Sequence, residues 1–304
     1  MLYLCTEMKL IVITGPTGVG KTATAIAVAK ALHCDIINAD SRQVYRGIPI
    51  ATATPTAHEL AQVPHHLIAC QELDEPYNAW QYEQDVMSLL PSLWASGDMA
   101  VLCGGSMMYV DAVCNGIDNM PDVQPQVRQA VKLQLAQQGL ESLVAELERL
   151  DPAYAAVVDR KNPVRVCHAI ELCRQTGVPY STLRTGQRKP RPFDIIKVGL
   201  TLERNELYDR INRRVDAMMS SGLEDEARRV WPLRHLQSLN TVGLKEMFAY
   251  LDGTIDRATA IERIKRNTRV YAKKQLTWFR RDPAIHWLPP GKPEAILQII
   301  QPIH

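Results

Sequence analysis

Short apolar segments alternate with helical ones along the first third of the chain. Runs rich in β-branched residues at 10–14, 35–39 and 99–103 are typical of buried strands, and apolar residues recur at helical spacing over 22–32 and 79–93. Strands that alternate with helices predict a parallel sheet covered on both faces. Ligands of such sheets bind beyond the carboxyl ends of the strands, so we expect a site there.

The pattern becomes purely helical after Gly116. From 125 to 177 the chain is rich in Gln and Ala without a strand-like run, and strand-like residues return only at 195–202. A long helical segment then follows over 203–221. This order predicts one α/β core, formed by residues 1–117 and 195–304, with residues 118–194 as an inserted helical domain.

The first turn between strand and helix carries a phosphate-binding motif. It fits G-x-x-x-x-G-K-[ST] and consists of Gly15, Pro16, Thr17, Gly18, Val19, Gly20, Lys21 and Thr22. Glycines let successive backbone N–H groups turn toward one anion, and the following helix adds the positive end of its dipole. Lys21 offers an ammonium to phosphate oxygens, and Thr22 offers a hydroxyl to Mg²⁺. The motif predicts an α/β fold of the P-loop NTPase-like kind that binds a di- or triphosphate.

Polar segments also follow the second and third strands. Asp40 ends the second strand, where its carboxylate either caps the amino-terminal end of a following helix or works beside the P-loop as a base or metal ligand. Gly104, Gly105 and Ser106 follow the third strand, either as a tight turn or as a close backbone approach to a ligand. No acidic residue follows this strand, which argues against a kinase or energy-coupling NTPase. A transferase whose diphosphate is a leaving group stays open.

Charge adds a basic segment near the end of the chain. The net charge of the 304 residues is only +2, but residues 256–282 hold nine basic side chains against three acidic ones. Arg263, Arg266, Arg269 and Lys273 recur at three- and four-residue steps and so share one helical face. That face is either a solvated surface or a contact for a phosphate backbone.

Hydropathy and cysteine usage limit the class of protein. No uninterrupted apolar run reaches the roughly 18 residues that a membrane-spanning helix requires, so we expect no membrane insertion. Seven cysteines are scattered without a C-x-x-C pair, as is typical of reduced residues in a cytoplasmic protein.

Beyond these patterns, the chain resembles the tRNA dimethylallyltransferases (tRNA isopentenyltransferases, the IPP transferase family) over most of its length. The resemblance lies in GPTGVGKT at 15–22, INADSRQVYRG at 37–47, PHHLI at 64–68, CGGSMMYV at 103–110, NPVRVCHAIEL at 162–172, RINRRVDAMMSSGLEDE at 210–226, VGLKE at 242–246 and YAKKQLTWFRR at 271–281. The order of D-S-x-Q-x-Y, G-G-[ST]-x-x-Y and a K-x-Q-x-T-W-F-R tail makes the resemblance specific.

The resemblance implies transfer of a dimethylallyl group from dimethylallyl diphosphate to N6 of adenosine 37, beside the tRNA anticodon. The P-loop would bind the diphosphate with Mg²⁺, and Thr22 would contact the metal. Asp40 would be the general base, with Ser106 near the adenine amine. Arg214, and after it Arg210, would be the arginine at the diphosphate.

The resemblance also implies contacts with the anticodon stem-loop of tRNA. The aligned positions are Asp40, Ser41, Arg42, Gln43, Ser106, Arg128, Val164, Arg165, Val166, Cys167, His168, Asn240, Thr241, Val242, Gly243, Leu244 and Lys245. We expect a monomer that acts in the cytoplasm.

Four positions depart from the pattern that the resemblance implies. Thr54 replaces a customary Lys, Val164 a Gln, His168 an Arg and Asn240 an Arg. Most of these contacts are on the RNA side, while the P-loop and Asp40 are intact. The departures therefore bear on the strength or choice of tRNA binding more than on the chemistry.

Two other functions compete with this interpretation. One is a prenyltransferase acting on free AMP, ADP or ATP, which would need neither the long insertion nor the basic segment at 256–282. The other is a P-loop RNA-binding NTPase without prenyl chemistry, against which the missing acidic residue after 99–103 counts.

Overall fold

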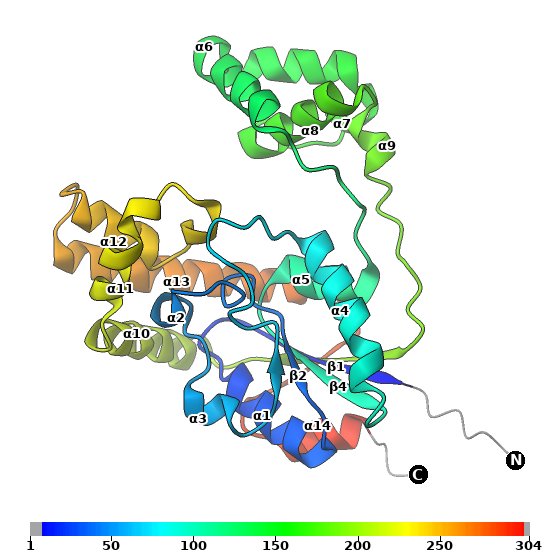
Figure 1. Cartoon of the computed structure of the whole chain (residues 1–304), viewed down its shortest axis with the longest axis vertical. Coiled ribbons are helices and arrows are strands. Elements are labelled where there is room, and N and C mark those ends of the chain that lie inside the picture. Colours follow the sequence, from blue (N-terminus) through cyan, green and yellow to red (C-terminus); the bar gives the residue numbers. More distant parts are fainter. Residues whose placement is uncertain (1–7, 301–304) are drawn as a thin grey trace, which may run out of the picture. The chain divides into compact units, whose positions relative to one another are not determined.

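The computed structural model describes residues 8–300, which divide into two compact units (Figure 1). One unit contains the described residues up to Asn115 and from Pro190 onward, and the other is Gly116–Lys189. The sequence analysis predicted that the chain re-enters the α/β core at residue 195. In the structure Arg191 is already part of that unit. Its guanidinium donates to the carbonyls of Ala112 and Val113 and pairs with the buried Glu83 at 2.6 Å.

The first unit is built on a parallel six-stranded sheet with the strand order β3-β2-β4-β1-β5-β6. The strands are β1 (Lys9–Thr14), β2 (Ile36–Asn38), β3 (His65–His66), β4 (Met99–Cys103), β5 (Asp194–Leu200) and β6 (Ile285–Leu288). The expected α/β fold with a parallel sheet is therefore confirmed. The sequence analysis predicted neither β3 nor β6. β3 consists of two histidines, which are too few and too polar for a recognisable apolar run.

Helices cover both faces of this sheet (Figure 1). The helices of this unit are α1 (Lys21–Leu32), α2 (Pro49–Thr52), α3 (Ala57–Leu60), α4 (Ala79–Leu93), α5 (Met107–Asn115), α10 (Arg204–Ser220), α11 (Leu223–Val230), α12 (Leu244–Leu251), α13 (Arg257–Phe279) and α14 (Pro293–Ile300), with 3₁₀ turns at Trp231–Leu233 and Gln237–Leu239. The faces themselves are covered by α1 and α14 on one side and by α4 and α5 on the other. Because successive side chains of a strand point to opposite faces, Leu10 and Val12 pack under α4 and α5, whereas Ile11 and Ile13 pack under α1 and α14. The described residues include no helix with the length and apolar character of a membrane span.

The second unit is a small helical body with its own core. It contains α6 (Pro125–Leu150), α7 (Pro152–Ala155), α8 (Pro163–Thr176) and α9 (Tyr180–Leu183). Gly139 interrupts α6 with non-helical backbone angles (φ 76°), so Val131 and Leu147 lie on two segments that both contribute to one core with Ile170. The buried Asp151 holds the unit together, since its carboxylate accepts hydrogen bonds from the backbone N–H groups of Tyr154 and Ser181.

Candidate functional site

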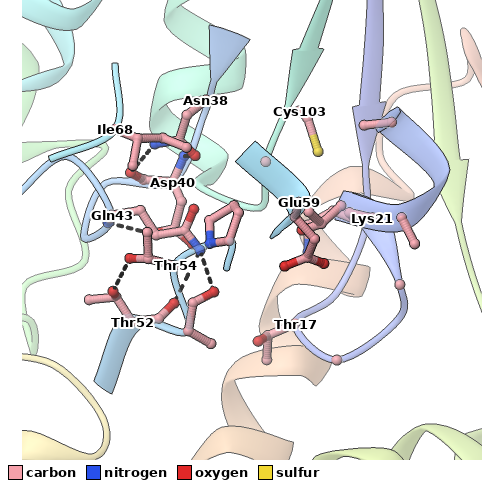
Figure 2. A pocket seen from close by; sticks show the side chains of 18 of the residues that line it. Thr17, Lys21, Asn38, Asp40, Gln43, Thr52, Thr54, Glu59, Ile68 and Cys103 are labelled. Carbon is pink, nitrogen blue, oxygen red and sulfur yellow. Dashed lines mark hydrogen bonds between the residues drawn. The ribbon is translucent and has the colours of Figure 1, made fainter. Parts of the chain in front are cut away.

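The P-loop lines one side of a cavity of about 850 Å³ at the carboxyl ends of the strands (Figure 2). Thr17, Gly18, Gly20, Lys21 and Thr22 face this cavity, while Gly15, Pro16 and Val19 are buried behind them. Gly20 precedes helix α1 with φ 105°, a left-handed backbone angle that favours glycine. The loop therefore turns into the amino-terminal end of α1, where unpaired N–H groups attract anions.

Lys21 folds back onto its own loop. Its Nζ donates to the carbonyl oxygens of Pro16 at 2.9 Å and of Gly15 at 3.1 Å. Burial lowers the pKa of Lys21 to about 8, although the nearby Cys103 and Asp40 raise it. At neutral pH the side chain is thus a positive charge held by weak backbone acceptors, which a phosphate oxygen can replace.

Helix α10 adds guanidinium groups to the same cavity. Arg210, Arg213 and Arg214 all line it, and Arg214 Nη1 donates to the hydroxyl of Thr17 at 3.2 Å. Burial lowers the pKa of Arg214 while Asp40 raises it, yet an arginine stays charged at neutral pH. Arg210 pairs with Glu206 one turn earlier at 2.9 Å, and its Nη1 also donates to the Val19 carbonyl of the P-loop at 3.5 Å. The sequence had named Arg214 and Arg210, and the structure adds Arg213.

Asp40 lies across the cavity from Lys21 (Figure 2). Its Oδ1 accepts hydrogen bonds from the backbone N–H of Arg42 at 2.8 Å and of Gln43 at 3.3 Å. Within residues 8–300, Oδ2 accepts no hydrogen bond. The helix cap that the sequence allowed is therefore not found, since residues 41–44 form a turn and the next helix begins at Pro49, but one oxygen of Asp40 does hold that turn. The role of Asp40 in chemistry stays a prediction.

Ser106 belongs to the turn between β4 and α5. It is 8% exposed, its backbone N–H donates to the carbonyl of Ala39 at 3.1 Å, and its own carbonyl accepts from Val110. Ser106 does not line the cavity, unlike the neighbouring Gly104. The segment is therefore a tight turn, as one interpretation from the sequence had it, and Gly104 also brings its backbone to the cavity, as the other had it. The role expected of the Ser106 hydroxyl stays a prediction.

A smaller groove of about 280 Å³ adjoins the cavity and shares Asp40, Arg214 and Tyr271 with it. Two segments that the sequence named separately both line this groove. Arg42 Nη1 also donates to the carbonyls of Gln237 and Ser238, both at 3.1 Å, just before the second segment. The predicted residues that line the groove are Asp40, Ser41, Arg42, Asn240, Thr241, Val242, Gly243 and Lys245, whereas Gln43 lines the cavity.

Two of the predicted tRNA-contacting side chains are core residues instead. Leu244 is fully buried at the start of α12, and Val166 is fully buried in the helical unit. Each lies on the apolar side of an amphipathic helix. Each of the two predicted tRNA-contacting segments, 164–168 and 240–245, therefore contains one side chain that points into the protein core. These two residues are therefore corrections to the expected contact set.

The other predicted residues of the helical unit lie at its surface. Arg128, Val164 and Arg165 are exposed, Val164 by 76%. Cys167 is half-buried. The pKa of His168 lies below its usual value, because the lowering effect of burial outweighs the raising effect of the nearby Glu171 carboxylate. Helix α8 begins where Asn162 accepts a hydrogen bond from the backbone N–H of Arg165.

The basic face of α13 is only partly free. Arg269 donates to Asn212 Oδ1 at 2.6 Å and is half-buried, while Arg263, Arg266 and Lys273 are exposed. Lys265, on the same helix, pairs with Asp216 at 2.8 Å. One arginine of the predicted face thus fastens α13 to α10, and the other three basic groups remain available to a polyanion.

A buried carboxylate anchors the segment that forms another wall of the cavity. Glu226 is fully buried, and its oxygens accept from the backbone N–H of Ile50 at 2.9 Å and of Ala51 at 2.7 Å. The pKa of Glu226 lies above its usual value, because the raising effect of burial outweighs the lowering effect of these two hydrogen bonds. The carbonyls of Thr52 and Ala53, just beyond, accept from Gln43. Sequence spacing could not reveal this pairing, because Glu226 is far along the chain.

Replacement of Glu226 by alanine should lower the free energy of unfolding by about 2–4 kcal/mol, because two buried N–H groups lose their acceptor. Glu226→Gln should cost less, since its carbonyl can still accept one of the bonds. Urea unfolding of both variants measures this order. Equal and small losses would mean that the 49–54 segment is held by other contacts.

The protein groups available to a metal are few. Within residues 8–300, no three His, Cys, Asp or Glu side chains gather in a way that could hold a metal ion. Thr22 lines the cavity at the first turn of α1. Mg²⁺ commonly binds through one or two protein oxygens, substrate phosphates and water, so this donor set fits a magnesium ion carried with a diphosphate.

Comparison with known proteins shows one consistent similarity. A family profile described as IPP transferase matches residues 43–282. The chain is 52% identical to tRNA dimethylallyltransferase 1 of Phocaeicola vulgatus, over 97% of this chain and 98% of that protein. It is also 52% identical to tRNA dimethylallyltransferase 1 of Bacteroides thetaiotaomicron, over 96% of this chain and 95% of that protein.

Solved structures agree with this similarity. A tRNA isopentenylpyrophosphate transferase from Bacillus halodurans is 37% identical, with a TM-score of 0.71 and coverage of 97% of this chain and 96% of that one. A eukaryotic dimethylallyltransferase acting on tRNA is 26% identical with a TM-score of 0.76, covering 93% of this chain and 74% of that one.

Proposed function

This chain belongs to the IPP transferase family, and from that premise we propose how its residues perform the reaction. The enzyme is a tRNA dimethylallyltransferase, which forms N6-(dimethylallyl)adenosine at position 37 of tRNA. One observation carries the proposal for the site: a single cavity has Lys21 and Arg214 beside the P-loop and Asp40 opposite them. Such a cavity can receive a diphosphate and an acceptor base together.

The P-loop binds the diphosphate of the prenyl donor. As the bond between the allylic carbon and the diphosphate oxygen breaks, negative charge grows on the leaving diphosphate. Lys21, Arg214 and the N–H groups at the start of α1 stabilise that charge, because they are already oriented toward the cavity. Thr22 would hold Mg²⁺ together with the diphosphate, and the ion would supply further positive charge there.

Asp40 accepts the proton from the adenine N6 amine. The N6 lone pair is delocalised into the ring, so a carboxylate that removes the proton as the C–N bond forms helps the attack. Oδ1 is occupied by the N–H groups of Arg42 and Gln43, which fixes the carboxylate in place. The free Oδ2 is the oxygen that faces the amine.

The anticodon loop enters through the adjoining groove. Residues 40–42, 240–243 and Lys245 line it, and the Arg42 guanidinium donates to the carbonyls of Gln237 and Ser238, just before the second segment. The adenine must leave its stack to reach Asp40, which costs a few kcal/mol and is easiest in a single-stranded loop. We assign Arg128, Arg165 and His168 of the helical unit, together with the exposed basic groups of α13, to binding the rest of the stem-loop.

The test of this function is direct. Purified protein, dimethylallyl diphosphate, Mg²⁺ and an anticodon stem-loop RNA should yield prenylated adenosine 37 by mass spectrometry. Efficient transfer to free AMP would favour the mononucleotide enzyme instead, and phosphate release from ATP without a prenyl donor would favour the NTPase. Size-exclusion chromatography tests the expectation of a monomer.

Charge reversal on the exposed face of α13 should weaken tRNA binding in a salt-dependent way. If Arg266 and Lys273 each contact one phosphate, the double variant Arg266→Glu, Lys273→Glu should reduce the slope of log K against log salt by about 1.5. Filter binding at several salt concentrations measures that slope. Lys30→Glu, at the far end of α1 from the P-loop, serves as the matched control. An unchanged slope in the double variant would leave α13 as a solvated face.

A further inference from the structure

Gln275 joins two parts of the site although it is far from both in sequence. It lies on α13 and is only 2% exposed. Its Oε1 accepts a hydrogen bond from the backbone N–H of Thr17 at 2.8 Å, and its Nε2 donates to the carbonyl of Gly105 at 2.7 Å. A single amide therefore bridges the P-loop and the loop after β4.

The bond to Thr17 controls the peptide unit on which Lys21 rests. That unit consists of the Pro16 carbonyl and the Thr17 N–H: Gln275 holds the N–H, and Lys21 Nζ donates to the carbonyl at 2.9 Å. The hydroxyl of the same Thr17 accepts from Arg214 at 3.2 Å. Of the two cations assigned to the diphosphate, Lys21 thus contacts the Pro16–Thr17 peptide unit that Gln275 holds, and Arg214 contacts the side chain of Thr17.

The bond to Gly105 needs a residue without a side chain. A Cβ at Gly105 would lie 2.4 Å from Gln275 Nε2 and 3.3 Å from Lys21 Nζ. Because glycine has no Cβ, this position leaves room for both the Gln275 amide and the Lys21 ammonium. This accounts for one glycine of the G-G-[ST]-x-x-Y motif and for the glutamine of the K-x-Q tail, to which the sequence assigned no role.

We propose that Gln275 is a positioning residue for the diphosphate, which sets the geometry of the P-loop and thereby of Lys21 and Arg214. The inference deepens the function proposed above and rests on the assignment of the diphosphate to the P-loop. A purely structural residue in this buried position of α13 could be apolar, whereas both polar atoms of Gln275 are used on the site itself.

The experiment measures the binding of inorganic pyrophosphate with Mg²⁺ to the full-length protein by calorimetry. Gln275→Met is close in size but can neither accept from Thr17 nor donate to Gly105. We expect its dissociation constant for pyrophosphate to rise about tenfold, as for the loss of a hydrogen bond that orients a charged site. Phe279→Leu, a buried change one turn further along α13, should lower the melting temperature without changing pyrophosphate affinity.

A second variant provides a readout that stability alone would not move. A protonated carboxyl at position 275 can accept from Thr17 and donate to Gly105, but a carboxylate repels the Gly105 carbonyl oxygen. The affinity of Gln275→Glu, relative to the unmodified chain at each pH, should therefore recover as the pH falls from about 8 to about 5.5. Gln275→Met should show no recovery.

The outcomes separate the inference from its premise. If Lys21→Met loses pyrophosphate binding while Gln275→Met retains it, Gln275 is only a structural residue and the inference is wrong. If Lys21→Met also binds pyrophosphate normally, the assignment of the diphosphate to the P-loop is wrong, and the inference about Gln275 is wrong with it. Recovery of Gln275→Glu at low pH together with weak binding by Gln275→Met would support the inference.

Discussion

Asp40→Asn should reduce the rate of prenyl transfer by about a thousandfold, within the range that general bases contribute, while pyrophosphate binding stays nearly unchanged. Asparagine keeps an Oδ1 that can accept from the N–H groups of Arg42 and Gln43, so the turn is preserved. It replaces the free Oδ2 with an amide nitrogen, which cannot take a proton from the adenine amine. The variant thus removes the proposed chemistry and leaves the local fold.

Single-turnover transfer to an anticodon stem-loop measures the chemical step of this variant. Asp40→Ala is the companion, because it removes the oxygen that holds the turn as well. It should lose a similar amount of activity and, in addition, about 1 kcal/mol of stability, as is typical for a lost hydrogen bond. If Asp40→Asn keeps full activity, Asp40 only holds the turn and the base must be sought elsewhere.

Lys21→Met should weaken pyrophosphate binding by about a hundredfold or more, because the anion loses its nearest ammonium in a partly dry cavity. Methionine retains much of the side-chain volume without the charge. Isothermal calorimetry with Mg²⁺ and pyrophosphate measures the effect. Unimpaired binding in this variant would contradict the assignment of the diphosphate to the P-loop.

The same lysine makes diphosphate binding dependent on pH. The pKa of Lys21 in the free protein is about 8, so below that pH the side chain is charged, and above it the side chain becomes neutral. Pyrophosphate affinity should therefore fall between about pH 7.5 and about pH 9.5 in the unmodified chain, relative to Lys21→Met at the same pH. Parallel curves for the two proteins would mean that Lys21 does not titrate in this range.

Several features of the protein were predictable from short stretches of sequence. The P-loop is one continuous segment between a strand and a helix, and its backbone geometry follows from its glycines, so residues 15–22 could be assigned a role without knowledge of the fold. Asp40 could be placed near it, since parallel strands bring their carboxyl ends to one edge. Specific motifs in a fixed order also identified the family, which the comparisons confirm.

Other features required the folded chain, because they depend on pairs of residues far apart in sequence or on which side of a helix faces the core. Gln275 reaches Thr17 across 258 positions, and Glu226 reaches Ala51 across 175. The burial of Val166 and Leu244 likewise depends on the neighbours that each helix finds. Local sequence determined the anion-binding loop and the position of the acid, since both depend on backbone conformation and strand order. Only tertiary packing decided which distant side chains hold that loop in place, because a buried hydrogen bond has no periodicity along the chain by which it could be recognised.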